Sequence, residues 1–327
     1  MSELSISAII CTHNRDRYLG AAIDSLLNQE LVPGLGQGVD QESESDLDLP
    51  HFEVLVIDNA STDQTRQVVE ARLSHPCLKY VYEPTLGLST ARNRGFQESS
   101  GDIIAYLDDD AVAEPYWLRE LLEAYAANEH LAVAGGRVTL LWPEGTVEPP
   151  AWISEDMMSC LGAYDLGAEI VNIQEPGLTP RGLNYSLRRS FLEEIGGFDA
   201  QLGRVGKKLL SNEELVMTEL ALAKGWQVQY LPQALVAHNV AEERMQRDWF
   251  LRRSWWQGVS EFYRDRLAGR SWVKQFGAAG ERFARGLYKA AKFVFRPDTC
   301  FDNLTYAYGQ IGYMSTAVHS IWKKEQA

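Results

Sequence analysis

The first 110 residues alternate short apolar, β-branched runs with longer segments in which apolar residues recur every three or four positions. Runs of the first kind predict buried strands, and segments of the second kind predict amphipathic helices. Strands that alternate with helices predict an α/β fold with a largely parallel sheet and helices on both faces. The expected strands are 6–11, 52–58, 78–83 and 102–108, and the expected helices are 17–29, 63–74 and 88–99.

The regular alternation ends near residue 130, and prolines at five positions between residues 142 and 180 interrupt any long element. Beyond residue 244 the sequence is helical in pattern and rich in aromatic residues. The segment from 30 to 50 lacks periodicity and is rich in glycine, proline and acid, which predicts an exposed loop. The later expected elements are strand sequence at 131–142 and 227–238 and helices at 190–199 and 212–226.

The amino-acid composition favours a soluble globular protein and argues against some functions. Apolar residues make up 45% and charged residues 23% of the 327 residues, as in soluble globular proteins. The formal net charge of −14 argues against a general nucleic-acid-binding protein. No stretch is long and apolar enough to predict a spanning helix, and the first ten residues do not resemble a secretion signal. The four cysteines are widely separated, which indicates reduced, cytoplasmic thiols.

The charge is unevenly distributed along the chain. Residues 244–296 contain thirteen Lys or Arg and four Asp or Glu, a local net charge of +9 that leaves −23 for the remainder. A basic, aromatic helix can lie on an anionic membrane surface, or it can pack as a cap that offsets an acidic body. The sequence leaves both open. The aromatic residues interleaved with arginine are Trp249, Phe250, Trp255, Trp256, Phe262 and Tyr263.

Three consecutive carboxylates, Asp108, Asp109 and Asp110, directly follow the fourth expected strand. Adjacent like charges are costly to bury unless a cation compensates them. A carboxylate pair with one residue between can hold Mg²⁺ or Mn²⁺ together with a substrate phosphate. The alternative is a solvated acidic turn. The position after a buried strand favours a site, because α/β sheets bind ligands at the carboxyl ends of their strands.

Two more polar stretches follow neighbouring strands, CTHNR after the first and DNAS after the second. We therefore expect several polar groups to converge at one sheet edge. Asp58 ends the second strand. Its carboxylate could accept a hydrogen bond from a nucleotide base or ribose, or it could cap the following helix.

Together these stretches resemble family 2 glycosyltransferases. The matching segments, in that family's order and spacing between residue 5 and about 245, are SAIICTHNRDRYLGAAIDSLLNQ, FEVLVIDNASTDQT, GLSTARNRGFQESSGDIIAYLDDDAVAEPYWL and GFDAQLG…SNEELVMTELALAKGWQVQYLPQALVAH. The resemblance implies a GT-A fold and an inverting sugar transfer from a nucleotide-diphosphate sugar. It also implies a nucleotide-binding half at 1–130, an acceptor and catalytic half at 131–243, and a helical extension at 244–327.

The resemblance assigns site roles by position. Asp58 would face the base, and Arg92 would lie near the base or the diphosphate. Asp108 would lie by the ribose, with Asp109 beside it, and Asp110 would hold a divalent cation. Such a cation, Mg²⁺ or Mn²⁺, would stabilise the leaving group as negative charge develops. The residues expected to line the nucleotide pocket are Thr12, Asn14 and Arg15.

An inverting transfer also requires a general base for the acceptor hydroxyl. In the family this is usually the Asp of a Glu-Asp pair that opens a helix, whereas this chain has Asn-Glu-Glu. We expect Glu214, at the Asp position, to be the base, with Glu213 as the alternative. Both carboxylates would in any case favour the positive end of the helix.

Two later residues complete the predicted site. His238 resembles the late histidine that completes the metal shell in many GT-A enzymes, although a lone histidine is often only a packed residue. Asn184 lies in RGLNYSLRR, which resembles the family's GxNxSxRR region, and is expected to face donor or acceptor.

The resemblance leaves the substrates open. A UDP-sugar is the expected donor by analogy alone, and the acceptor is a saccharide or a lipid-linked molecule of polysaccharide or glycolipid assembly. We expect a cytoplasmic protein, at the inner face of the membrane if residues 244–296 bind lipid.

Two other functions compete with sugar transfer. A non-catalytic scaffold that binds a sugar nucleotide is favoured only by the Glu-for-Asp change. An aspartyl-phosphate phosphotransferase would need its acidic pair after an early strand, with Ser or Thr and Lys downstream. The sequence shows no convincing set of such partners.

Overall fold

The computed structural model describes residues 4–31, 52–146, 148–206 and 208–324. The chain divides into two compact units, each built from three segments. The loop expected between residues 30 and 50 lies almost entirely outside the described residues. The first unit comprises Met1–Thr139, Tyr164–Ala200 and Glu214–His238, and the second comprises Leu140–Ala163, Gln201–Glu213 and Asn239–Ala327.

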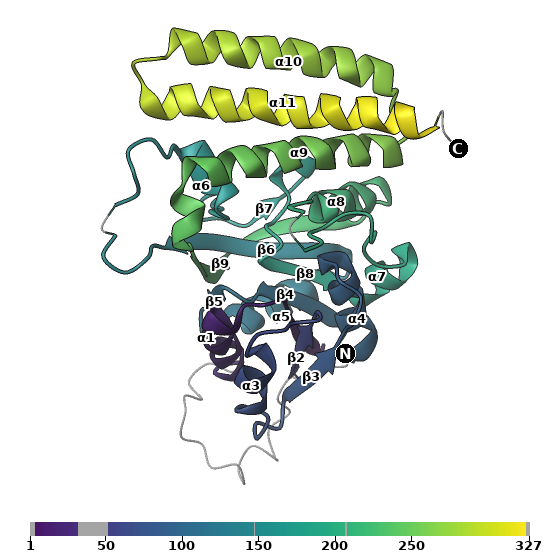
Figure 1. The fold of residues 1–327 in the computed structure, drawn as a ribbon. Coiled ribbons are helices and arrows are strands. Elements are labelled where there is room, and N and C mark those ends of the chain that lie inside the picture. Colours follow the sequence, from purple (N-terminus) through teal and green to yellow (C-terminus); the bar gives the residue numbers. More distant parts are fainter. Residues whose placement is uncertain (1–3, 32–51, 147, 207, 325–327) are drawn as a thin grey trace. The chain divides into compact units, whose positions relative to one another are not determined.

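The first unit is built on a mixed sheet (Figure 1). Within the described residues the strand order is β3-β2-β1-β4-β8-β6-β9-β5, with β7 beside β9. The pairs β1–β2, β1–β4 and β2–β3 are parallel, and a helix lies in each connection between these strands. The pairs β4–β8, β6–β8, β5–β9 and β7–β9 are antiparallel. The strands are β1 (Ile6–Thr12), β2 (Phe52–Asp58), β3 (Leu78–Tyr82), β4 (Ile103–Asp108), β5 (Ala111–Ala113), β6 (Leu131–Leu141), β7 (Val171–Asn172), β8 (Asn184–Arg188) and β9 (Gln227–Asn239).

Helices cover this sheet and bury its apolar strands. The central strands read as continuous apolar runs because both of their faces are buried, as Ile9, Val56 and Ile104 illustrate. The parallel arrangement expected from the sequence is therefore present in β1–β4, and the later strands make the sheet mixed. The helices are α1 (Asp16–Leu27), α3 (Thr65–Glu70), α4 (Leu88–Glu98), α5 (Trp117–Ala127), α7 (Arg189–Ile195) and α8 (Glu213–Ala223), with the 3-10 helix η1 (Pro176–Leu178).

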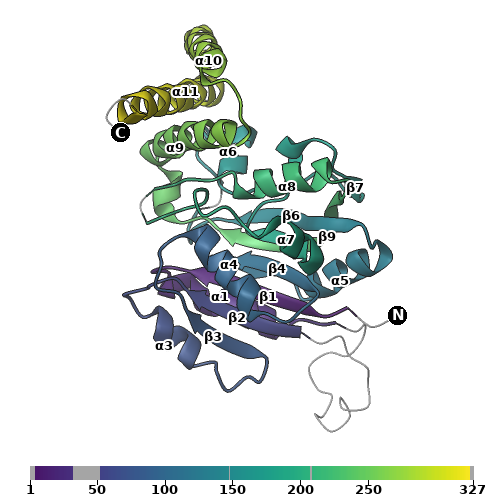
Figure 2. The ribbon, with the colours of Figure 1, turned by 90° about the vertical axis from the view of Figure 1, so that its right-hand side faces the viewer.

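The second unit is helical, and α11 lies between α9 and α10 (Figures 1 and 2). The ring of Trp152 packs edge-on against Phe250 at 5.6 Å and against Phe301 at 5.3 Å between centroids. Phe262 packs in the same way against Tyr313 at 5.6 Å. No described helix is both long enough and apolar enough to cross a bilayer. The helices are α6 (Glu155–Cys160), η2 (Glu242–Met245), α9 (Arg247–Leu267), α10 (Trp272–Lys292) and α11 (Pro297–Lys324).

Candidate active site

The carboxyl ends of three parallel strands meet at one edge of the first unit's sheet. Strand β1 ends at Thr12, β2 at Asp58 and β4 at Asp108. Thr12 lies opposite Asp58 in the register, and Cys11 lies opposite Asp108, so the three ends are level. The convergence expected from the polar stretches after these strands is therefore present, at the position where α/β sheets bind ligands.

Asp110 lies just beyond this edge, and the pairing of β5 with β9 brings His238 to it. Ala111 is directly opposite His238 in the antiparallel register. His238 Nε2 lies 3.1 Å from Asp110 Oδ1, and Arg15 Nη1 lies 3.6 Å from Asp110 Oδ2. The carboxylate and the imidazole are both buried. Three residues that are far apart in the sequence and were predicted to share a site therefore lie together.

The acidic triplet is not a solvated turn, because Asp109 and Asp110 are both buried. Burial and the neighbouring Asp110 raise the pKa of Asp109 above its usual range. The Arg15 guanidinium and the Thr12 hydroxyl act in the opposite direction and favour its ionised form. Crowded buried carboxylates of this kind favour the binding of an additional cation.

The donor atoms fit a divalent cation that is held jointly with a substrate. The Asp110 carboxylate and the His238 imidazole are ligands that Mn²⁺ accepts, and the carboxylate also suits Mg²⁺. Among the described residues no group of three or more His, Cys, Asp or Glu side chains is arranged to hold a metal alone. Cations of this class commonly take one or two protein ligands and complete their shell with substrate phosphates.

Asp58 is buried and is engaged by its own loop. Its Oδ1 accepts a hydrogen bond from the Ser61 amide at 2.9 Å, and its Oδ2 accepts one from the Tyr80 hydroxyl at 2.7 Å. Helix α3 begins only at Thr65 and has no side-chain cap. Asp58 therefore does not cap this helix, and instead it shapes the turn that follows β2.

Asn14 joins the loops that follow β1 and β2. It has a left-handed backbone conformation with φ of 53°, which asparagine tolerates better than most residues. Its Oδ1 accepts a hydrogen bond from the Thr62 amide at 2.7 Å, and its own amide donates to Ser61 Oγ at 3.0 Å. The two loops thereby form one continuous rim beside the strand ends.

Arg92 in α4 directly contacts Glu214, the residue predicted to be the general base. Arg92 is 2% exposed, and its Nη1 donates to Glu214 Oε1 at 2.9 Å. Its Nη2 donates to the Gly182 carbonyl at 3.3 Å, and its guanidinium lies 5.6 Å from the Tyr106 ring and 5.4 Å from the Phe198 ring. The family resemblance assigns Arg92 to the neighbourhood of the nucleotide base or diphosphate, and in the structure its guanidinium contacts Glu214.

Glu213 and Glu214 open α8 together but belong to different units of the chain. Glu213 is buried in the second unit, and Glu214 lies in the first unit with Arg92. Glu214 contacts Arg92 directly, and which of the two glutamates is the base stays a prediction.

Asn184 departs from its expected position facing donor or acceptor. It is fully buried, and its Oδ1 accepts a hydrogen bond from Trp117 Nε1 at 2.8 Å. Its Nδ2 donates to the Ala234 carbonyl at 2.7 Å and to the Arg137 carbonyl at 3.2 Å. The side-chain amide is thus occupied by the fold, where it links β8 to α5, β6 and β9.

The aromatic residues that surround Arg92 were not predicted from the sequence. The Tyr106 hydroxyl donates to the Arg92 carbonyl at 3.0 Å, and the Tyr106 ring meets Phe198 edge-on. Tyr106 precedes Asp108 by two positions in β4. Because side chains two positions apart lie on the same face of a strand, this spacing could have predicted that Tyr106 lies near the site.

Burial raises the pKa of the Cys11 thiol to about 12, and Asp108 adds to this effect, so the thiol at this edge stays neutral. No sequence signal pointed to Cys11.

A family profile and a curated relative both indicate that the chain is similar to glycosyltransferases. The profile described as Glycosyl transferase family 2 matches residues 7–178. The chain is 28% identical over 267 residues to a glucosyl-dolichyl phosphate glucuronosyltransferase of Haloferax volcanii, covering 81% of this chain and 78% of the relative.

Two solved structures share the fold. A mannosyltransferase from Pyrobaculum calidifontis in complex with GDP-Man and Mn²⁺ aligns with a TM-score of 0.59 at 18% identity, covering 99% of this chain and 89% of that one. GalNAc-T7 with UDP, GalNAc and Mn²⁺ aligns with a TM-score of 0.52 at 16% identity, covering 79% of this chain and 48% of that one.

Proposed function

Because the chain belongs to glycosyl transferase family 2 and has a GT-A fold, we propose that it transfers a sugar from a nucleotide-diphosphate sugar to an acceptor hydroxyl, with inversion and with a divalent cation. The observation that carries this proposal is the contact of Asp110 with His238 and Arg15 beside the level ends of β1, β2 and β4. This arrangement presents buried acids, an imidazole and a guanidinium where a diphosphate and its cation can bind.

The nucleotide is bound by the rim that follows β1 and β2. Thr12, Asn14 and Arg15 line it, Asp58 faces the base, and Asp108 and Asp109 lie toward the ribose. The two solved neighbours carry GDP-Man and UDP respectively, so the nucleotide base differs even among proteins of this fold. We take a UDP-sugar as the first donor to test, since uridine is common among relatives.

Asp110 and His238 would hold the divalent cation. When bound, this cation supplies positive charge that stabilises the departing nucleoside diphosphate. Arg15 adds a second positive group on the other carboxylate oxygen of Asp110. Both neighbours contain Mn²⁺, which makes Mn²⁺ the first cation to test.

Glu214 is the general base. The acceptor oxygen forms a bond to the anomeric carbon while the bond from that carbon to the diphosphate oxygen breaks, and the acceptor proton passes to the Glu214 carboxylate. Arg92 donates to Oε1 of Glu214, which restrains the orientation of the carboxylate that would accept the proton. Arg92 is therefore a positioning residue for the base.

The acceptor is a lipid-linked saccharide of glycolipid or polysaccharide assembly. The Haloferax volcanii relative, whose name includes a glucosyl-dolichyl phosphate, favours this class over a free sugar. The protein works in the cytoplasm at the inner face of the membrane, and residues 244–296 contribute the membrane contact. Residues 1–130 serve the donor, residues 131–243 serve the acceptor, and residues 244–327 form the extension.

The test is product formation from a panel of nucleotide sugars, each incubated with Mn²⁺ or with EDTA and with saccharide or polyprenyl-phosphate-linked acceptors. Mass spectrometry identifies the transferred sugar, and proton NMR of the new linkage gives its configuration. Transfer with inversion that requires Mn²⁺ is expected. Binding of a sugar nucleotide without transfer to any acceptor would favour the scaffold function, and a retained configuration would contradict the mechanism.

A further inference from the structure

Helix α10 forms one side of the helical layer in the second unit, and only one of its faces is used for packing. Ala279, Gly286 and Ala290 are buried, and Gly286 lies close to the backbone of Asn303 and Ala307 on α11. These positions recur at helical spacing and form the inner face of the helix. The residues that lie on its other side are exposed in this unit.

The exposed side carries an apolar row. Ala284, Tyr288, Ala291 and Phe295 follow one another at intervals of four, three and four residues and are all exposed. Tyr288 is 69% exposed and Phe295 is 97% exposed. Val273 continues the row toward the start of the helix. A row of this length with such exposed aromatic residues is unusual on a surface that faces only water.

A cationic row runs beside the apolar one, displaced by a single residue. Arg285, Lys289, Lys292 and Arg296 repeat the same four, three and four spacing, and all are exposed. Within the described parts of the chain, none of these four forms an ion pair with a carboxylate. Glu281 is the sole acid in α10. The exposed side of α10 therefore carries an apolar strip beside a positive strip up to Lys292, and the turn that follows adds the exposed Phe295 and Arg296.

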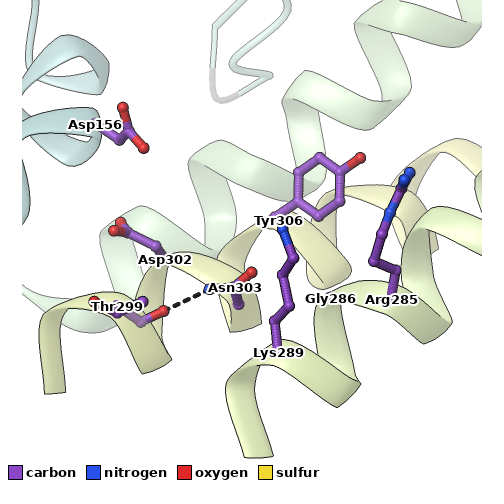
Figure 3. A pocket seen from close by; sticks show the side chains of 8 residues that line it. All are labelled: Asp156, Arg285, Gly286, Lys289, Thr299, Asp302, Asn303 and Tyr306. Carbon is purple, nitrogen blue, oxygen red and sulfur yellow. Dashed lines mark hydrogen bonds between the residues drawn. The ribbon is translucent and has the colours of Figure 1, made fainter. Parts of the chain in front are cut away.

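Arg285 and Lys289 also border a polar hollow of about 550 Å³ between α10, α11 and α6 (Figure 3). Asp156 and Asp302 line the same hollow. Because the hollow holds both charge signs, it is a poor site for an anion by itself. The outer surface of α10 is the stronger candidate for a binding surface, because it carries exposed apolar residues beside exposed cations.

We propose that the outer side of α10 and the turn that follows it lie on an anionic phospholipid surface. Tyr288 and Phe295 enter the headgroup region while Lys292 and Arg296 contact lipid phosphates, as in helices that lie in the membrane plane. The reason for choosing lipid is charge complementarity, because the exposed cations match the negative surface potential of an anionic bilayer. This goes beyond sugar transfer, and it assigns the membrane contact to α10.

The aromatic residues that the sequence interleaves with arginine lie on α9 and are packed more closely than Tyr288 of α10. Trp249 and Phe250 contact each other edge-on and pack among apolar side chains of the second unit. Phe262 is buried against Tyr313. Phe250 and Phe262 are core residues, and the remaining aromatic side chains of α9 are half-buried, so α9 exposes less aromatic surface than Tyr288 and Phe295 do.

The test is flotation of the intact protein with vesicles of phosphatidylglycerol and phosphatidylcholine, and with vesicles of phosphatidylcholine alone. We expect wild type to float with the anionic vesicles and to be released by high salt. Lys292→Glu with Arg296→Glu, and separately Tyr288→Ser with Phe295→Ser, should each weaken partition by about tenfold or more. All four positions are exposed, so folding should be unchanged, which thermal unfolding checks.

Ile170→Ser is the matched control, because Ile170 is an exposed apolar residue, at 61%, in the first unit. It should float as wild type does. A wild type that stays out of the anionic vesicles, floats equally on both vesicle types, or dimerises through this face by size-exclusion chromatography would overturn the proposal. Flotation requires no sugar transfer, so the proposed activity and the membrane contact can fail independently.

Discussion

Asp110 and Glu214 are both carboxylates of the first unit that lie beside a cationic side chain, yet their contacts differ. Asp110 meets an imidazole at 3.1 Å and a guanidinium at 3.6 Å, one at each oxygen. Glu214 meets the buried Arg92 at 2.9 Å through one oxygen. The first contact with arginine is loose, and the second is a direct charge-assisted hydrogen bond.

The difference indicates two kinds of chemistry. A carboxylate crowded by the buried Asp109 is one that an additional cation would stabilise, in line with the proposed role of Asp110. A carboxylate fixed by a buried arginine has a defined orientation, which suits proton transfer at a set position. The comparison therefore predicts that Asp110 governs cation and donor binding, whereas Glu214 governs the transfer step alone.

Asp110→Asn should have the largest effect, a loss of about 10³-fold in transfer, because it removes a cation ligand next to the leaving group. Donor affinity in the presence of Mn²⁺ should fall as well. Initial rates across a Mn²⁺ titration measure both. Asp109→Asn is the control and should lose less. Equal losses in the two variants would show that the triplet acts as a unit.

Glu214→Gln should lower kcat by about 10²-fold to 10³-fold and leave donor affinity unchanged, because the amide cannot accept the acceptor proton. Steady-state kinetics with parallel calorimetric binding of the donor separate the two effects. Glu213→Gln is the neighbouring control, and its kcat should stay close to that of wild type. Should Glu213→Gln be the inactive variant, the base would be Glu213.

Gly182→Ala should reduce kcat by about tenfold to 10²-fold, because a side chain at Gly182 would clash with both Glu214 and Arg92 and displace the carboxylate. The Mn²⁺ dependence of the rate should not change. Gly177→Ala is a matched control, because open space surrounds Gly177. If the rate of Gly182→Ala no longer depended on Mn²⁺, the regions around Asp110 and Glu214 would not act independently.

Glu53 is a buried carboxylate that lies outside the candidate site and can be compared with Asp110 and Glu214. Burial raises its pKa, but hydrogen bonds from Lys79, Ser100 and Ser7 outweigh this and lower the pKa to about 2. A depressed folded-state pKa contributes stability that is complete above the unfolded value near 4.5 and is lost as the pH falls toward 2.

Glu53→Gln should therefore reduce the free energy of unfolding by about 1 to 2 kcal/mol at pH 7, because solvent around the exposed Lys79 screens part of the interaction, and by progressively less below pH 4.5, with no effect on transfer. Urea unfolding between pH 3 and pH 7 measures this difference. Glu70→Gln, which removes an exposed ion pair with Arg66, should have little effect at any pH. A constant difference across the pH range would contradict the assigned cause.

The sequence predicted most of the elements that build the site, and the failures have physical reasons. The apolar runs of β1, β2 and β4 are long because these strands are buried on both faces. Strand β8 gave no such signal, because Asn184 and Ser186 are buried polar residues that hydrogen-bond to neighbouring strands. Strand β5 is only three residues long.

The acidic triplet was indicated by its position at the end of a buried strand, whereas His238 and Glu214 were assigned only through a family resemblance. The contact of Arg92 with Glu214 joins α4 to α8 across a sequence separation of 122 residues, and no local signal encodes it. The same holds for the tail, where packing in the second unit decided which aromatic residues became core and which stayed exposed.

Ligand-dependent thermal unfolding of wild type and Asp110→Asn, with a panel of UDP- and GDP-sugars in the presence and absence of Mn²⁺, tests the central claim most directly. A ligand that binds only the folded state raises the unfolding temperature. At least one nucleotide sugar should stabilise wild type when Mn²⁺ is present, and this shift should be lost without Mn²⁺ and in the variant. An equal shift in the variant, or one that is indifferent to Mn²⁺, would contradict the assignment of Asp110 as the residue that couples the cation to the donor.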